Sequence, residues 1–145
     1  MDYFKVTRRL TKDQRELKKA VQRCVFNVLM NNKDDHAKNF AFMMTKEREW
    51  KLAPPFDLTY CPGYRGEHFL DIAGEGKAPA RDHIIKAAES AGLSAKDTNQ
   101  IIDELVATTS DESFKRLAKE LPIKAKTVTE VAKIIDGNRK RLMND

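Results

Sequence analysis

Residues 32–39 read NKDDHAKN, a polar stretch that separates two patterns of different period. Before it, apolar residues recur at helical spacing from 17 to 29. Thr11 followed three residues later by Gln14 has the form of a capping box, which marks a helix start. We therefore predict a helix over about 12–31 that leads directly into the polar stretch.

The chain after the polar stretch changes to an extended pattern. Short apolar runs at 40–44 and 50–53 flank a charged turn at 46–49, which predicts a small β hairpin. Four of the five prolines and four of the six glycines then fall within 54–79. This density argues against a regular helix, so we predict a long loop, and long loops in compact domains are usually functional.

The C-terminal part returns to helical patterns. Ser94 with Asp97 and Thr127 with Glu130 each have the form of a capping box, and another helical pattern stops at Pro122. We expect these helices to contribute aliphatic residues to the core, among them Ile101, Ile102, Leu105, Val106, Leu117, Leu121, Ile134, Ile135 and Leu142. The predicted fold class is mainly α, a helical body with one small β hairpin.

Length and composition are those of an ordinary globular domain. The 145 residues suit one domain, in which 1–78 forms a loop-bearing half and 79–145 a helical half. The net charge is +5, but 27 basic residues are interleaved with 22 acidic ones. Two cysteines argue against a disulfide framework. No apolar run approaches the roughly 20 residues of a membrane span, and no signal-peptide pattern occurs, so we expect a cytoplasmic protein without a membrane partner.

The polar stretch and the residue after the hairpin have the groups that phosphoryl transfer needs. That reaction requires a carboxylate to orient and deprotonate the attacking hydroxyl, and oxygen ligands for magnesium. Asp34 would be the base, while Asn39 and Asp57 would reach the metal from either side of the hairpin. Because a hairpin returns the chain to the same edge, we expect Asn39 and Asp57 to lie close together. Singly, such residues can simply cap turns.

These residues belong to a longer pattern. VFNVL at 25–29, NKDDHAKNF at 32–40 and LAPPFD at 52–57 resemble the C-terminal lobe of HipA-like kinases, and HFLDI at 68–72 also fits. The resemblance extends over most of the chain. It implies the helical lobe of a serine/threonine protein kinase that uses ATP and Mg²⁺ and acts as the toxin of a bacterial toxin-antitoxin system.

The resemblance also implies residue roles and partners. Asp34 would be the catalytic base, and Asn39 and Asp57 the magnesium ligands. We add Lys38 as a catalytic residue, because a cation there would offset charge on the transferred phosphate. His36 is grouped with the cofactor-binding residues, since it would fix the shape of the loop. The implied partners are a protein substrate such as an aminoacyl-tRNA synthetase, a helix-turn-helix antitoxin, and DNA only through that antitoxin.

A lobe that grips the nucleotide phosphates is not evident in the sequence. No G-x-G-x-x-G or G-x4-G-K-[ST] pattern occurs, and GEGK at 74–77 is short and follows the catalytic loop. We expect the chain to need an N-terminal kinase lobe, in cis or in trans, and to be inactive alone. Met43, Met44 and Trp50 are expected to pack beneath the nucleotide site.

Other functions remain open. A basic helical module that binds nucleic acid or an antitoxin would fit the net charge, although no basic stripe with interleaved aromatics occurs. A small-molecule phosphotransferase lobe would share the catalytic loop, although such enzymes often carry His where this chain has Asn32. A zinc site of His36, Cys61 and His68 matches no zinc spacing pattern.

Overall fold

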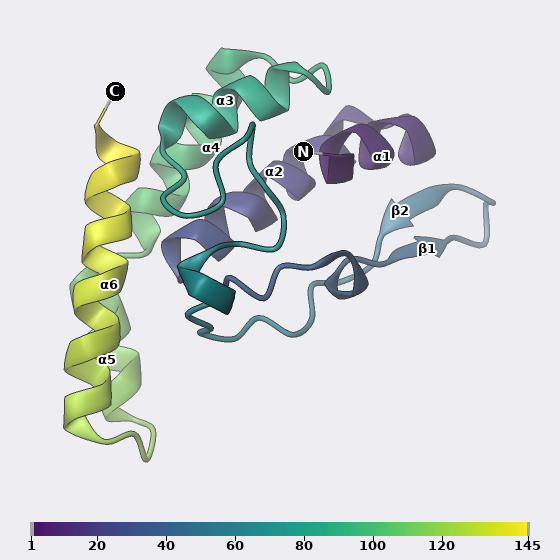
Figure 1. Cartoon of the computed structure of the whole chain (residues 1–145). Coiled ribbons are helices and arrows are strands. Elements are labelled where there is room, and N and C mark those ends of the chain that lie inside the picture. The colour runs from purple at the N-terminus through teal and green to yellow at the C-terminus, as the bar shows by residue number, and fades with distance from the viewer. Residues whose placement is uncertain (1, 145) are drawn as a thin grey trace.

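The computed structural model describes residues 2–144, except for the side chain of Asp111, and within them the fold is mainly helical with one two-stranded antiparallel sheet (Figure 1). The predicted fold class is therefore confirmed. The elements in chain order are α1 (Asp2–Thr11), α2 (Gln14–Leu29), β1 (Phe42–Met44), β2 (Trp50–Leu52), α3 (Arg81–Glu89), α4 (Ala95–Thr108), α5 (Asp111–Lys119) and α6 (Ala125–Met143). Among these residues, no helix combines the length and apolar character of a membrane span.

Helix α1 is absent from the sequence-based prediction. It buries Tyr3, Phe4 and Thr7 and packs against α2. The hydroxyl of Thr7 donates to the Tyr3 carbonyl at 2.8 Å, so a polar residue occupies a core position without an unpaired group. Apolar residues do recur at helical spacing in this segment, at Tyr3, Phe4, Val6 and Leu10, so the sequence carried a signal for α1 that the prediction did not use.

Helix α2 begins at Gln14, and the predicted capping box of Thr11 and Gln14 is wrong. Asp13 is the N-cap, and its side chain accepts a hydrogen bond from the Arg15 main-chain N–H at 2.8 Å. Hydrogen bonds from the Arg15 side chain and main chain lower the pKa of the Asp13 carboxyl to about 2. Thr11 instead ends α1, where its hydroxyl donates to the Thr7 carbonyl.

The hairpin forms where predicted, and a buried carboxylate anchors it to α2. Phe42 pairs with Leu52 at its open end. Glu16 is 2% exposed, and its two carboxylate oxygens accept from Leu52 N–H at 2.8 Å and from Lys19 Nζ at 2.7 Å. Burial opposes ionisation of Glu16, but the hydrogen bonds from Lys19 and Leu52 outweigh it and hold the pKa of the carboxyl below its ordinary value.

We expect Glu16→Gln to destabilise the fold by about 1–2 kcal/mol at neutral pH, because a charge-assisted buried hydrogen bond becomes a neutral one. The folded-state pKa of Glu16 is lowered, so its contribution is present above the unfolded pKa of about 4.3 and is lost as pH falls through the folded value. Urea unfolding at several pH values measures this difference, which should shrink below about pH 4. Glu49→Gln is the matched control, since that exposed hairpin carboxylate pairs with Lys51 at the surface. If the difference in unfolding free energy between the wild type and Glu16→Gln grew on acidification, the role proposed for the Glu16 carboxylate would be contradicted.

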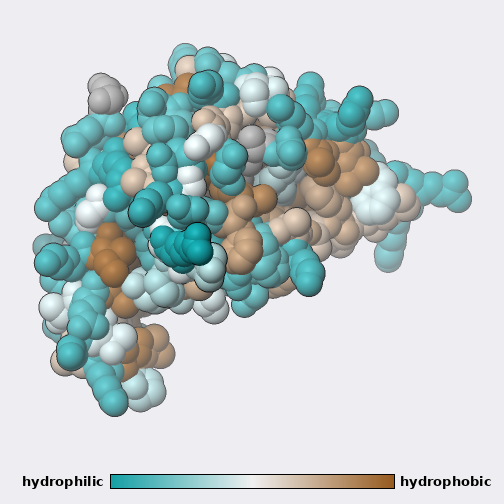
Figure 2. Space-filling model, viewed as in Figure 1, coloured by the Kyte–Doolittle hydropathy of each residue, from teal (hydrophilic) through white to brown (hydrophobic). Residues whose placement is uncertain are grey.

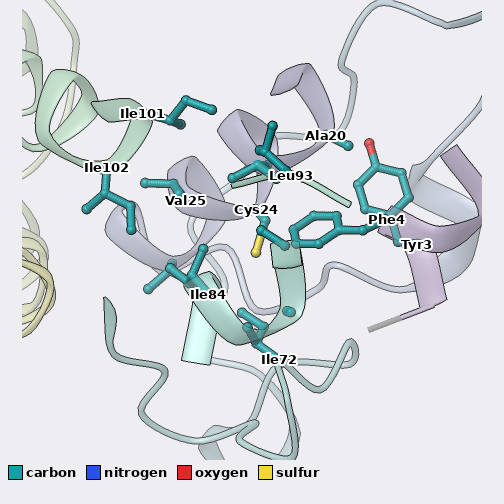
Figure 3. Packing of buried hydrophobic residues seen from close by; sticks show 14 of the residues in the cluster. Tyr3, Phe4, Ala20, Cys24, Val25, Ile72, Ile84, Leu93, Ile101 and Ile102 are labelled. Atoms are coloured by element: carbon teal, nitrogen blue, oxygen red, sulfur yellow. The ribbon is translucent and has the colours of Figure 1, made fainter. Parts of the chain in front are cut away.

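One hydrophobic core joins the two halves of the chain. Figure 3 shows Phe4 of α1, Cys24 and Val25 of α2, Ile84 of α3 and Ile102 of α4 gathered around one centre. Burial raises the pKa of the Cys24 thiol, which is packed here as a small hydrophobe. Ile72 comes from the long loop and is fully buried, so this loop is tied into the core.

Helix α5 and the N-terminal half of α6 project from the helical body, whereas the C-terminal half of α6 packs against it (Figure 1). The predicted capping box of Thr127 and Glu130 is wrong, because α6 begins at Ala125 after Lys124, whose side chain makes no capping bond. Water can satisfy the N–H groups of this exposed helix end. Leu117 and Leu121 are exposed rather than buried, and Figure 2 shows hydrophobic surface at this end of the molecule.

The hairpin carries a second exposed hydrophobic surface. Met43, Met44 and Trp50 were expected to pack beneath a nucleotide site, but they are 47%, 52% and 37% exposed. Met44 and Trp50 are cross-strand partners on the face that also carries Phe42 and Leu52, and Met43 lies on the opposite face, because the side chains alternate. The packing expected for these three residues is therefore absent within residues 2–144.

Candidate functional site

The polar loop leaves the C-terminal end of α2 and is held on both sides by the long Pro/Gly-rich loop. At the end of α2, the Asn138 side chain of α6 donates to the Val28 carbonyl at 2.9 Å. Lys33 N–H then donates to the Cys61 carbonyl at 3.2 Å, and Phe69 N–H donates to the Lys33 carbonyl at 3.3 Å. The long loop therefore contacts the polar segment on two sides.

The ammonium group of Lys33 also hydrogen-bonds to the long loop. It donates to the carbonyls of Gly66 at 2.6 Å and Lys77 at 3.1 Å. Burial lowers the pKa of Lys33, and Arg141 and Lys77 lower it further. Lys33 therefore connects separate turns of the long loop.

Asp35 is the buried support of the polar loop. It is 3% exposed and accepts hydrogen bonds from His68 Nδ1 at 2.9 Å, from Phe69 N–H at 2.8 Å and from Leu70 N–H at 3.3 Å. The side chain of His68 is also buried. This network fixes the loop next to the partly exposed Asp34, so the two neighbouring carboxylates have different environments.

We expect Asp35→Ala to lower the free energy of unfolding by about 3 kcal/mol, because it leaves the buried His68 and the N–H groups of Phe69 and Leu70 unpaired. Urea unfolding measures the change. Asp34→Ala, at the preceding position of the same loop, is the matched control. Since the Asp34 side chain is 41% exposed, we expect its free energy of unfolding to change by no more than about 0.5 kcal/mol. Equal destabilisation by the two variants would contradict this assignment.

Asp34 and Asn39 bracket the tip of the polar loop. The Asn39 side-chain amide nitrogen donates to the main-chain carbonyl of Asp34 at 2.7 Å. This bond closes the loop around a short 3-10 turn at Ala37–Asn39 and leaves the amide oxygen of Asn39 available. The Asp34 carboxylate remains partly exposed, with the nearest cation-forming group, His36 Nε2, at 3.7 Å.

Asn39 and Asp57 lie together, as the hairpin geometry predicts. Both line one small cavity at the base of the hairpin, and its other lining residues are Arg23, Asn27, Asn32, Asp35, Phe40, Pro55, Phe56 and Leu58. Asp57 adopts a left-handed backbone conformation with φ of +54° and is exposed. Within residues 2–144 its carboxylate makes no hydrogen bond or ion pair, so both oxygens are free to bind a ligand.

Asp34, His36 and Lys38 do not line this cavity. His36 Nδ1 accepts a hydrogen bond from Lys38 N–H at 3.2 Å, and its ring meets Phe69 edge-on at 5.6 Å. These contacts give His36 a role in shaping the loop. Lys38 is exposed. Their proposed contacts with nucleotide remain predictions.

Sequence reasoning missed two buried amides of the site. Asn27 and Asn32 are 3% and 2% exposed, and Asn32 Nδ2 donates to Asn27 Oδ1 at 3.1 Å. The available signal was an asparagine on the buried face of an otherwise apolar helix. Such a residue needs a polar partner, and Asn32 supplies it.

The residues around the cavity fit magnesium better than zinc. Among residues 2–144 no group of three or more His, Cys, Asp or Glu side chains is placed to hold a metal ion. Asn39 and Asp57 offer an amide oxygen and a carboxylate, and the buried Asn32 Oδ1 lacks a hydrogen-bond partner in this region of the chain. Magnesium in phosphoryl-transfer sites is bound in this way, by one or two protein oxygens together with phosphates and water.

Comparison with known proteins agrees with this architecture. The family described as HipA-like C-terminal domain matches residues 1–113. HipA of Shewanella oneidensis MR-1, solved in a toxin-antitoxin complex with HipB and operator DNA, superimposes with a TM-score of 0.81 at 17% identity. The match covers 97% of this chain and 35% of that HipA chain. No curated protein matches.

The fold and the candidate site define a mainly helical domain built around an Asp-x4-Asn loop. The family match spans well over half of the sequence, so the chain belongs to the HipA-like C-terminal domain family. It spans about a third of the length of the solved HipA to which it is similar.

Proposed function

We propose that this chain is the C-terminal catalytic lobe of a HipA-like protein kinase, which transfers the γ-phosphate of ATP to a serine or threonine of a protein. The observation that carries the proposal is the convergence of Asn39 and Asp57 on one cavity, with Asn39 hydrogen-bonded to the main chain of Asp34. These are the residue types and the grouping that the reaction requires.

In the proposed reaction, the Asp34 carboxylate orients the hydroxyl of the acceptor and takes its proton. The hydroxyl oxygen forms a bond to the γ-phosphorus while the bond from that phosphorus to the β,γ-bridging oxygen breaks, and ADP leaves. Asn39 and Asp57 would hold Mg²⁺, which, when bound, neutralises charge on the phosphates. Lys38 would offset charge on the transferred group from the exposed side of the loop.

A second lobe is part of the proposal. Positioning of the phosphates contributes a major share of catalysis, and none of the loops described above is a glycine-rich phosphate cradle. The exposed Met43, Met44 and Trp50 on the hairpin are suited to contact such a lobe, since large exposed apolar groups mark interaction surfaces. We propose that this N-terminal lobe joins in cis or in trans.

The partners follow from the solved relative. Shewanella HipA was solved with HipB and operator DNA. By analogy, we propose that this chain acts in a toxin-antitoxin system with a helix-turn-helix antitoxin, and meets DNA only through it. The protein substrate, such as an aminoacyl-tRNA synthetase, and the cytoplasmic location belong to the same proposal.

The test uses a two-lobe protein, meaning this chain together with a kinase N-lobe, fused or supplied separately. Incubated with γ-labelled ATP and a bacterial lysate, it should place label on serine or threonine of protein, and EDTA should abolish the labelling. Label confined to small molecules would indicate a phosphotransferase instead. No labelling, together with steeply salt-dependent DNA binding by the chain, would indicate a nucleic-acid-binding module.

A further inference from the structure

Asn32 occupies a constrained position between α2 and the proposed metal site. Its main-chain N–H donates to the Asn27 carbonyl at 2.8 Å, and its backbone pairs with Cys61 in an isolated parallel bridge. The residue is 2% exposed. Its side chain therefore has little freedom and is held toward the cavity that Asn39 and Asp57 line.

The orientation of the Asn32 amide follows from its partners. The amide nitrogen lies 3.1 Å from Asn27 Oδ1 and 3.4 Å from the main-chain oxygen of Asp57. A main-chain carbonyl can only accept, so the nitrogen must face Asp57. The amide oxygen is buried and has no hydrogen-bond partner within residues 2–144, which leaves one acceptor in the cavity.

Asp57 needs such support. It lies in the segment 54–60, which is exposed and lacks helix and strand, and its φ of +54° is unfavourable for a residue with a side chain. Within residues 2–144, the bond from Asn32 is the one hydrogen bond found between this segment and the rest of the chain. The direction of the Asp57 carboxylate depends on the backbone that this bond holds.

We infer that Asn32 is a positioning residue for the proposed metal ligand Asp57. The Asn32 side-chain amide hydrogen-bonds both to Asn27, in the last turns of α2, and to the main chain of Asp57. It thereby holds the Asp57 backbone against α2 and keeps the Asp57 carboxylate beside Asn39. The inference rests on the proposed function, because it assigns Asp57 the role of a magnesium ligand. Mutation of partners that orient a ligand in this way typically weakens metal affinity by about 10- to 100-fold.

The test measures metal binding by the 145-residue chain, with Mn²⁺ as a paramagnetic probe for the magnesium site. In the wild-type chain, Mn²⁺ titrated into the millimolar range should broaden the NMR signals of residues around Asn39 and Asp57. In Asn32→Ala we expect the same signals to broaden with about tenfold weaker affinity. Asn31→Gly is the matched control. Asn31 is a buried neighbour whose side chain donates to Cys61, and glycine accepts its φ of +54°. This variant should keep the wild-type affinity.

The possible results distinguish a failure of the role inferred for Asn32 from a failure of the proposed metal site. Unchanged Mn²⁺ affinity in a folded Asn32→Ala chain, with broadening still centred on Asn39 and Asp57, would overturn the role of Asn32 and leave the proposed function standing. Broadening elsewhere in the wild-type chain would overturn the proposed metal site and the inference with it. If Asn32→Ala does not fold, the wild-type chain decides: nuclear Overhauser effects from the Asn32 side-chain amide protons to the Asp57 main chain support the inference, and their absence overturns it.

Discussion

Asp34→Ala in the two-lobe protein is expected to lower the rate of phosphate transfer by about 10²- to 10⁴-fold, the usual contribution of a general base. The proposed role needs an accessible carboxylate, and that of Asp34 is partly exposed while its main-chain carbonyl accepts a hydrogen bond from Asn39. Initial rates with γ-labelled ATP at saturating Mg²⁺ measure the effect.

The same variant should keep its fold, since Asp35 and not Asp34 supports the loop. A normal urea unfolding curve for Asp34→Ala therefore accompanies the rate measurement. Near-normal transfer by a folded Asp34→Ala protein would remove Asp34 from the reaction and leave the catalytic assignment without its base.

Asp57→Asn should produce the second large effect, a loss of about 10²- to 10³-fold in transfer together with a raised magnesium requirement. The substitution keeps the size of the side chain but removes the one carboxylate that faces the cavity without an internal partner in residues 2–144. Rates measured over a range of Mg²⁺ concentrations separate weak metal binding from lost chemistry.

Asp71→Asn serves as the control for Asp57→Asn. Asp71 is exposed in the same long loop, where its carboxylate accepts from Gly74 N–H at 2.7 Å, and it does not line the cavity. We expect normal transfer and a normal magnesium requirement in this variant. If both substitutions reduced transfer alike, the effect would belong to the loop as a whole and not to a metal ligand.

The hairpin and the position of Asn39 and Asp57 at one cavity could be predicted, because both depend on the local sequence pattern. Apolar runs around a charged turn predict two short strands, and a hairpin necessarily brings its ends together. The start of helix α4 after Ser94 was predictable for the same reason, because Ser94 Oγ accepts a hydrogen bond from the Asp97 main-chain N–H. Such features depend on residues that are close together in the sequence.

Features that depend on tertiary contacts were not predictable from the sequence. Thr11 and Asp13 are both good N-cap residues, and the choice between them depends on α1, whose last turn uses Thr11. The anchoring of the hairpin by Glu16 and the link from Asn32 to Asp57 each join distant parts of the chain. The polar character of these buried residues is visible in the sequence, but their partners are not.

The most direct test of the account compares phosphate transfer by the 145-residue chain alone with transfer by the two-lobe protein, both at saturating Mg²⁺ and ATP. The account predicts magnesium-dependent labelling of protein serine or threonine by the two-lobe protein, and for the chain alone a signal no higher than that of Asp34→Ala. Robust magnesium-dependent transfer by the chain alone would contradict the claim that these residues hold the base and metal ligands but need a second lobe to position the nucleotide.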